Sequence, residues 1–98
     1  MLRDRALEKK LIVLQTLASI RSGELCSYAE LARRSGYPGS ARHIARLLHN
    51  CPDHLPWWRI IRADQRLGLN EHSSEGRLQC ERLQQEGWHL HCGKLIHD

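Results

Sequence analysis

Residues 27–49 of this 98-residue chain read SYAELARRSGYPGSARHIARLLH, and this stretch decides the fold. Ser27, followed three residues later by Glu30, forms the capping-box pattern that begins a helix. The Gly/Pro-rich residues 35–39 end that helix, and a second helix is expected from about Ser40 to His49. Two short helices joined by such a turn are typical of a helix-turn-helix, here at about residues 28–49.

The second of these helices carries a basic stripe. Arg42 and Arg46 lie four residues apart and therefore share one helical face. The apolar positions fall on another face, at Ala41, Ile44, Ala45 and Leu48. A plain helical hairpin with a solvated basic face would show the same pattern, so the residues alone leave both interpretations open.

Helices are also expected on either side of this unit. The spacing of three and four residues predicts an amphipathic helix over residues 4–20, whose apolar stripe is Leu7, Leu11, Leu14 and Leu17. We expect this stripe to pack on the core. Ser73 or Ser74 caps a last helix that runs to about Glu86 and ends at Gly87.

Short strands complete the expected fold. Residues 24–26 form a short link, and the β-branched pair Ile60-Ile61 predicts a short strand. Residues 63–66 are turn-like and residues 67–70 irregular. Residues 88–97 predict a β-hairpin that turns at Cys92 and Gly93.

Composition narrows the class of protein. The length suits one domain over residues 1–98, and the net charge of +4 favours polyanions, with nucleic acid first and anionic membranes second. Residues 1–10, MLRDRALEKK, lack the apolar core of a signal peptide, and no apolar run approaches roughly 18 residues, so we expect no membrane partner and a cytoplasmic location. None of the four Cys forms a C-x-x-C pair, so neither a zinc ribbon nor a redox motif is expected, and no metal or other cofactor is assigned. In the cytoplasm the thiols are expected to be reduced.

Three segments resemble, in order, the O6-alkylguanine-DNA alkyltransferases. Residues 23–32, GELCSYAELA, resemble the start of their DNA-binding helix-turn-helix, and residues 40–42 resemble the opening of the recognition helix. Residues 55–61, LPWWRII, lie where that family carries a Pro-Cys-His-Arg active-site motif. The resemblance runs from about Arg21 to Gly87. It implies a mostly α, winged helix-turn-helix domain with short strands, like the C-terminal domain of those enzymes, whereas 98 residues leave no room for their extra N-terminal domain.

The chain differs from the family at the residues that carry out alkyl transfer. Trp57 replaces the nucleophilic Cys and Trp58 replaces the neighbouring His, a pattern that resembles the alkyltransferase-like proteins. Alkyl transfer needs a thiolate, which neither Trp supplies, so no catalytic residue and no enzyme activity are expected. The resemblance implies a monomer that binds double-stranded DNA containing O6-alkylguanine and flips the damaged base into a Trp-lined pocket. It then flags the lesion for nucleotide excision repair proteins, in the cytoplasm or at a bacterial nucleoid.

The resemblance also assigns site residues. By resemblance, Tyr28 presses on the 3′ phosphate of the target, and Arg42 fills the gap left by the flipped base. The implied DNA contacts are Tyr28, Ser40, Arg42, Arg46 and Arg59. The implied lesion pocket consists of Tyr28, Pro56, Trp57, Arg59, Leu67 and Gly68. Further candidates for phosphate contacts are Arg33, Arg34, Arg62 and Arg66.

Some positions are expected to have a structural role or a simpler contact. Without the resemblance, Tyr28 reads as a packing residue and Arg42 as a phosphate contact. Glu86 matches an acidic residue that assists the family's His, and without that His we expect it to be structural. Trp58 is expected in the core, and Asn70 stands where the family often has a Tyr.

Two alternative functions remain. A helix-turn-helix transcriptional regulator explains residues 27–50, but it gives no reason for the segment Pro56-Trp57-Trp58-Arg59. An alkyltransferase that uses a different thiol would need Cys26, Cys51, Cys80 or Cys92 to reach the pocket.

Overall fold

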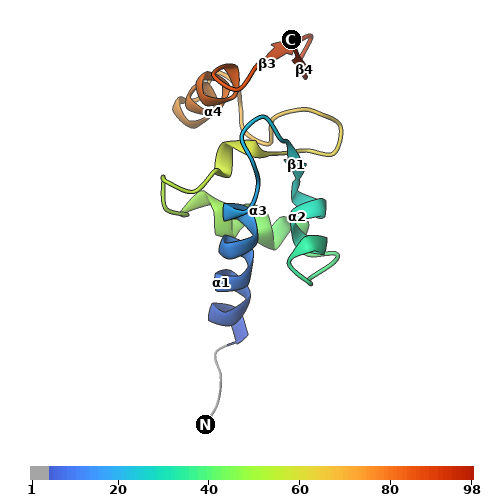
Figure 1. Ribbon diagram of the computed structural model, residues 1–98, viewed down its shortest axis with the longest axis vertical. Helices are drawn as coiled ribbons and strands as arrows, with labels where there is room; N and C mark the ends of the chain where they lie inside the picture. Colours follow the sequence, from blue (N-terminus) through green and yellow to red (C-terminus); the bar gives the residue numbers. More distant parts are fainter. Residues whose placement is uncertain (1–4) are drawn as a thin grey trace.

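The computed structural model describes residues 5–98, in which four α-helices and two short two-stranded sheets form the mostly helical domain that the sequence predicts. The elements are α1 (Arg5–Ala18), β1 (Cys26–Ser27), α2 (Tyr28–Arg34), α3 (Ala41–His49), the 3-10 turn η1 (Trp57–Arg59), β2 (Ile60–Ile61), α4 (Ser74–Gln84), β3 (Trp88–His91) and β4 (Lys94–His97). Helix α1 projects along the long axis at one end, and the β3–β4 hairpin lies at the other (Figure 1).

The helix-turn-helix is built by local hydrogen bonds. Ser27 caps α2 as predicted, because its hydroxyl oxygen accepts from the backbone N–H of Glu30 at 3.0 Å. The helix ends in a left-handed residue, Gly36, with φ of 86°. The N–H of Tyr37 then donates to the carbonyl of Ala32 at 2.9 Å, a Schellman ending that only glycine makes without strain.

The buried face of α1 differs from the predicted leucine stripe. Val13 and Leu17 of α1 are buried, as is Ile20 just after the helix, whereas Leu7 is 53% exposed and Leu11 52% exposed. The prediction that Leu7 and Leu11 pack on the core was therefore wrong. The first turns of α1 extend past α2 and α3 (Figure 1), so only the later part of the helix reaches the core. The first predicted helical residue, Asp4, lies outside the described residues.

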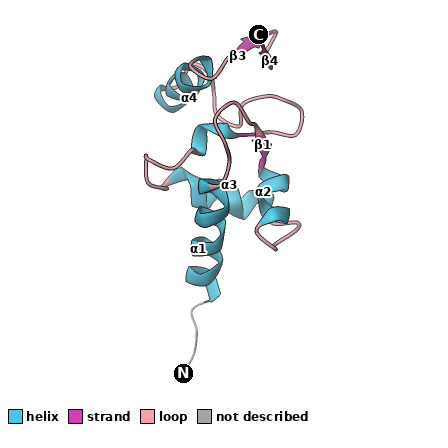
Figure 2. Cartoon of the chain, viewed as in Figure 1, coloured by secondary structure: helices cyan, strands magenta, loops and turns pink. Residues whose placement is uncertain are grey.

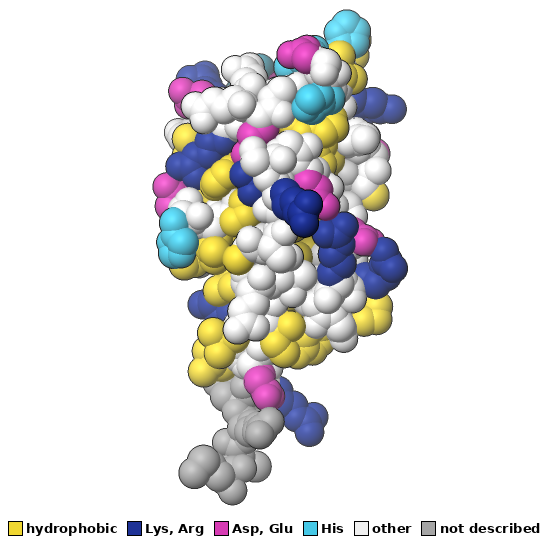
Figure 3. Space-filling view, viewed as in Figure 1, with side chains coloured by type: hydrophobic (Ala, Val, Ile, Leu, Met, Phe, Trp, Pro, Cys, Tyr) yellow, Lys and Arg dark blue, Asp and Glu magenta, His cyan; other side chains and the backbone are white. Residues whose placement is uncertain are grey.

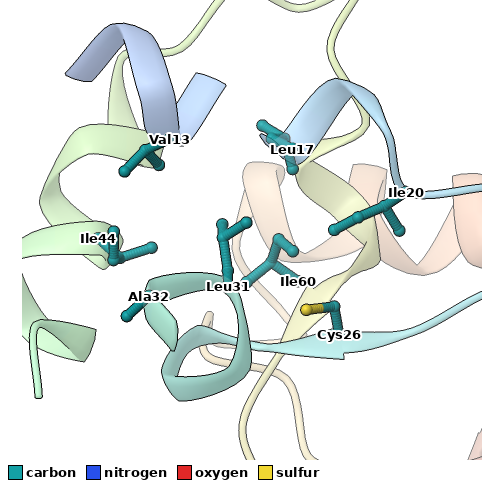
Figure 4. Close-up of a cluster of buried hydrophobic side chains, with 8 residues drawn as sticks. All are labelled: Val13, Leu17, Ile20, Cys26, Leu31, Ala32, Ile44 and Ile60. Atoms are coloured by element: carbon teal, nitrogen blue, oxygen red, sulfur yellow. The ribbon is translucent and has the colours of Figure 1, made fainter. Parts of the chain in front are cut away.

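The main core lies where α1, α2 and α3 meet the first sheet. Figure 4 shows its eight side chains converging from these elements: Val13, Leu17, Ile20, Cys26, Leu31, Ala32, Ile44 and Ile60. The predicted strand at Ile60 and Ile61 is confirmed, and it pairs in parallel with Cys26 and Ser27. The expectation that Cys26 belongs to a short link was wrong. Two residues are too few to show the pattern of a strand, and their partner strand is distant in the sequence.

A second hydrophobic cluster joins α4 to the hairpin. Ile61, next to Ile60 on β2, points to the other side of the strand and packs with Leu67, Leu83 and Leu95. Ser73 caps α4 by accepting from the N–H of Gly76 at 3.0 Å. The α-helix ends at Gln84, two residues before its predicted end.

The predicted hairpin is confirmed (Figure 2). Its turn consists of two left-handed residues, Cys92 with φ of 52° and Gly93 with φ of 80°. Two-residue hairpin turns favour this conformation because its twist matches that of the flanking strands. Within residues 5–98, no helix combines the length and the apolar character needed to cross a bilayer.

Candidate functional site

The exposed face of α3 presents two arginines without acidic partners. Arg42 and Arg46 are exposed, and within residues 5–98 neither forms an ion pair. The other predicted phosphate contacts are paired: Arg33 and Arg34 with Glu30, and Arg62 and Arg66 with Asp64. On the face shown in Figure 3, several Lys and Arg side chains lie beside Asp and Glu side chains. Among the predicted DNA contacts in residues 5–98, Arg42 and Arg46 of α3 are therefore the arginines whose charge no carboxylate neutralises.

Ser40 connects the helix-turn-helix to α1. It stands at the N-cap position of α3 and makes no side-chain cap hydrogen bond. Its hydroxyl oxygen instead accepts from Lys9 Nζ at 3.0 Å, and the Lys9 ammonium also lies 4.9 Å from the centre of the Tyr37 ring. These contacts fix the start of α3, from which Arg42 projects.

A cavity of about 250 Å³ opens beside α3. It lies where the beginning of α2, the later turns of α3, the 3-10 turn and α4 meet. Its lining residues are Tyr28, Ala45, Leu48, His49, Cys51, Asp53, Trp57, Leu69, Glu75, Leu78 and Gln79. The volume lies just below the roughly 300–1,000 Å³ of drug-sized pockets, so it suits one small heterocycle.

Tyr28 stands at one side of the cavity, on the first residue of α2. Burial raises the pKa of its hydroxyl, so the group stays a protonated hydrogen-bond donor. The backbone of Gly68 lies against the ring: a Cβ there would stand 2.5 Å from Tyr28 Oη and 2.9 Å from Cε2. The backbone of Gly68 thus limits where the Tyr28 ring can lie.

Trp57 forms another wall and is held by polar contacts. Its indole N–H donates to Asp53 Oδ1 at 3.3 Å, and Arg82 Nη2 donates to Asp53 Oδ2 at 2.9 Å. The Arg82 guanidinium lies 4.8 Å from the Trp58 ring centre and 5.7 Å from that of Trp57. The two indoles meet edge to face, with their centres 6.1 Å apart.

Glu86 connects the segment that follows Trp57 to the rest of the fold. Its carboxylate accepts from Trp58 Nε1 at 2.9 Å, from Arg59 Nη2 at 2.8 Å and from the Gly23 N–H at 3.1 Å. Burial raises the pKa of Glu86, but the hydrogen bonds from Arg59, Trp58 and Gly23 outweigh it, and the net pKa is lowered. Glu86 is therefore an ionised structural anchor, as the sequence suggested.

Arg59 donates its hydrogen bonds to acceptors inside the fold. In addition to Glu86, its Nη1 donates to the carbonyl of Ile20 at 2.7 Å, and its side chain is only 13% exposed. This placement differs from the sequence-based assignment of Arg59 to the DNA contacts and to the pocket. Because its donors face internal acceptors and it does not line the cavity, Arg59 supports the motif from within the fold.

The cavity lining overlaps with only part of the predicted pocket. Of the six predicted residues, Tyr28 and Trp57 line it. Pro56 is buried at the start of η1, Leu67 packs in the second cluster, and Gly68 supports Tyr28 from behind. Leu69 lines the cavity in their place, because the irregular backbone of residues 67–70 turns that side chain inward.

Several lining residues were missed by sequence reasoning. Gln79 is 1% exposed, and its Nε2 donates to the carbonyls of Trp58 and Ile60 at 3.1 Å each, while within residues 5–98 its Oε1 has no partner. Cys51 also lines the cavity, but burial and the charge of Asp53 raise its pKa and disfavour the thiolate. No local pattern around Gln79 or Cys51 signals these positions. In the described part of the chain, no three His, Cys, Asp or Glu side chains are arranged to hold a metal ion.

Comparison with known proteins identifies relatives of this architecture. The family model described as the DNA-binding domain of 6-O-methylguanine DNA methyltransferase matches residues 8–88. A "DNA base-flipping protein" of Vibrio parahaemolyticus is 32% identical over 77 residues, covering 76% of this chain and 75% of the relative. "Alkyltransferase-like protein 1" of Schizosaccharomyces pombe is 31% identical over 77 residues, covering 76% and 71%.

Solved structures show the same fold. The S. pombe Atl1 in a complex with damaged DNA containing O6-carboxymethylguanine superposes with a TM-score of 0.80 at 24% identity, covering 99% of this chain and 93% of that one. The Mycobacterium tuberculosis OGT in complex with DNA gives a TM-score of 0.68 at 28% identity, covering 79% of this chain but 47% of that one. The predicted winged helix-turn-helix class is therefore confirmed.

Proposed function

The chain belongs to the family of the 6-O-methylguanine DNA methyltransferase DNA-binding domain, within its alkyltransferase-like group, and from this premise we propose its function. It binds double-stranded DNA that contains O6-alkylguanine, flips the damaged base into the cavity beside α3, and leaves the alkyl group in place. The names of the relatives, a base-flipping protein and an alkyltransferase-like protein, support this proposal.

The observation that carries it is the position of the cavity. Tyr28 and Trp57 line it together with Ala45 and Leu48 of α3, the same helix whose exposed face carries Arg42 and Arg46. A base rotated out of the stack next to a recognition helix would enter this space directly. The cost of unstacking, a few kcal/mol, is offset by contacts that the extrahelical base makes in the cavity.

Each side chain has a role in this scheme. Tyr28 is a protonated donor beside the backbone of the target nucleotide, and Arg42 fills the gap in the duplex, since a guanidinium both stacks and donates hydrogen bonds. Arg46 contacts phosphate. The indole of Trp57 offers a flat apolar surface to the alkyl group, so bulky adducts are accepted as well as methyl.

No alkyl transfer is expected at this site. Trp57 stands at the position of the family's nucleophile, and Trp58 donates to Glu86 where a His would be oriented as a base. The raised pKa of Cys51 keeps the thiol in that cavity protonated. A lesion that is bound but not repaired requires a second system, and we assign this step to nucleotide excision repair proteins.

We further propose that residues 1–98 act as one domain and as a monomer, in the compartment that holds the DNA. The two hydrophobic clusters support the single domain, because adjacent residues of β2, Ile60 and Ile61, connect them. Sedimentation of the protein with and without a lesion duplex would test the monomer.

The test of the function is a binding titration against matched duplexes with guanine or O6-methylguanine, followed by mass spectrometry of the protein. We expect tighter binding to the lesion and no added methyl mass. Equal affinity for both duplexes would favour a general or regulatory DNA-binding protein. A methyl adduct would identify one of the four Cys as a nucleophile. Faster excision of the lesion by purified nucleotide excision repair proteins would test the last step.

A further inference from the structure

Trp57 is positioned differently from its neighbour Trp58. Trp58 packs against the second hydrophobic cluster and donates its N–H to the anchored carboxylate of Glu86. Both indoles are partly buried and belong to the same uncapped 3-10 turn, but Trp57 packs in neither hydrophobic cluster of residues 5–98 and instead lines the cavity. Packing alone therefore does not fix the orientation of the Trp57 ring.

Two charged side chains outside the main core supply that orientation. Asp53, 72% exposed by its side chain, accepts the Trp57 N–H through Oδ1 and the Arg82 Nη2 donor through Oδ2. Arg82, 24% exposed by its side chain, also donates from Nη1 to the Asp53 carbonyl at 3.3 Å. Its guanidinium lies against both indoles, so Trp57 is held at its N–H edge and over its ring.

We propose that Asp53 and Arg82 are a pair of positioning residues that hold Trp57 as a wall of the cavity and thereby set the preference for alkylated over unmodified guanine. This inference rests on the proposed function. The preference depends on how closely an alkyl group packs on the indole, which changes when the ring rotates. Overall DNA affinity depends instead on cations that face the phosphates, such as Arg46.

The chemistry of Arg82 supports a positioning role over a role in DNA contact. Both of its terminal nitrogens donate to Asp53, and the plane of its guanidinium is covered by indoles. A phosphate would have to replace Asp53, and Trp57 would then lose its hydrogen-bonded support. The pair links α4 to the loop before Trp57 across 29 residues of sequence, and of its two members only Asp53 also lines the cavity, so Arg82 reaches the cavity through Asp53 and the indole.

The experiment compares two variants that break the pair with two that remove the same charges elsewhere. The first two are Asp53→Ala and Arg82→Gln. The controls are Asp64→Ala, whose carboxylate pairs with Arg62 away from the cavity, and Arg77→Gln, an exposed residue of the same helix α4. Each protein is titrated with matched duplexes containing guanine or O6-methylguanine, and the ratio of the two Kd values is the readout.

We expect the ratio to fall about three- to tenfold in Asp53→Ala and in Arg82→Gln, and to stay unchanged in both controls. The double variant should lose no more than either single variant, because both act through one indole. Asp53→Glu should restore part of the ratio. Near-ultraviolet circular dichroism of the free protein should change in the two test variants, since the edge-to-face indole pair is disturbed.

Two results separate this inference from the function on which it depends. If the unaltered protein does not prefer the lesion, the proposed function fails. If it does prefer the lesion and Trp57→Ala abolishes that preference, an unchanged ratio in Asp53→Ala and Arg82→Gln overturns the positioning role alone. A lowered ratio without a change in the indole spectrum overturns it as well.

Discussion

The indole nitrogen of Trp58 donates to Glu86 Oε2 at 2.9 Å, and the same carboxylate oxygen accepts from Arg59 Nη2 at 2.8 Å. An indole N–H only donates, so the Trp58 ring nitrogen has no lone pair with which to accept a proton. The carboxylate is therefore occupied by structural contacts. It connects the Trp motif to the end of α4 and to the loop at Gly23.

The first prediction concerns this anchor. Glu86→Ala leaves the guanidinium of Arg59 buried without its partner, and we expect the free energy of unfolding to fall by about 3 kcal/mol. Urea denaturation measures the change. Glu75→Ala, which removes an exposed acidic residue from the first turn of α4, should change stability by less than about 0.5 kcal/mol. Equal losses of unfolding free energy in the two variants would contradict the anchoring role of Glu86.

The second prediction is a pH dependence of stability. Burial raises the pKa of Glu86, but hydrogen bonds to its carboxylate lower the net folded pKa below the unfolded one, which is about 4.3. The carboxylate then contributes stability that is present above the unfolded pKa and lost as pH falls through the folded pKa. Between neutral pH and strong acid, Glu86→Gln should therefore show a smaller loss of stability than the unaltered protein. Parallel urea midpoints for the two proteins across that range would contradict the assignment.

The third prediction concerns salt. DNA affinity should fall steeply between about 50 and 200 mM salt, because phosphate contacts release counterions. Arg46→Ala should reduce the slope of log K against log salt by about one unit. Arg33→Ala is the matched control on α2, and its effect should be smaller since Arg33 already pairs with Glu30. Equal reductions of the slope by the two substitutions would contradict the assignment of the phosphate-binding surface to α3.

The fourth prediction tests the support of Tyr28. Gly68→Ala places a methyl group 2.5 Å from Tyr28 Oη, so the ring must shift, and lesion affinity should fall about tenfold. The titration is repeated in a Tyr28→Ala background, where the added methyl group meets no ring. There we expect Gly68→Ala to have little further effect. A full additional loss in that background would mean that Gly68 acts by another route.

Sequence reasoning succeeded where the deciding contacts are local. Ser27 and Ser73 each cap a helix through an N–H three residues ahead, and the hairpin turns within Cys92 and Gly93. Such features depend on backbone geometry and residue type within a few positions, so composition and spacing were sufficient to place them.

Tertiary structure alone decided which side chains share the cavity. Asp53 meets Arg82 across 29 residues, Arg59 meets Glu86 across 27, and Gln79 enters the lining from a helix that the sequence treated as scaffold. The burial of α1 was likewise set by how far α2 and α3 extend along it, which its leucine spacing does not encode. Periodicity specifies that a helix forms and roughly which residues are apolar, but burial depends on neighbours brought by the folded chain. The chain sequence therefore determined the helices, their caps and the hairpin, whereas packing over long sequence separations determined the cavity and the support of its walls.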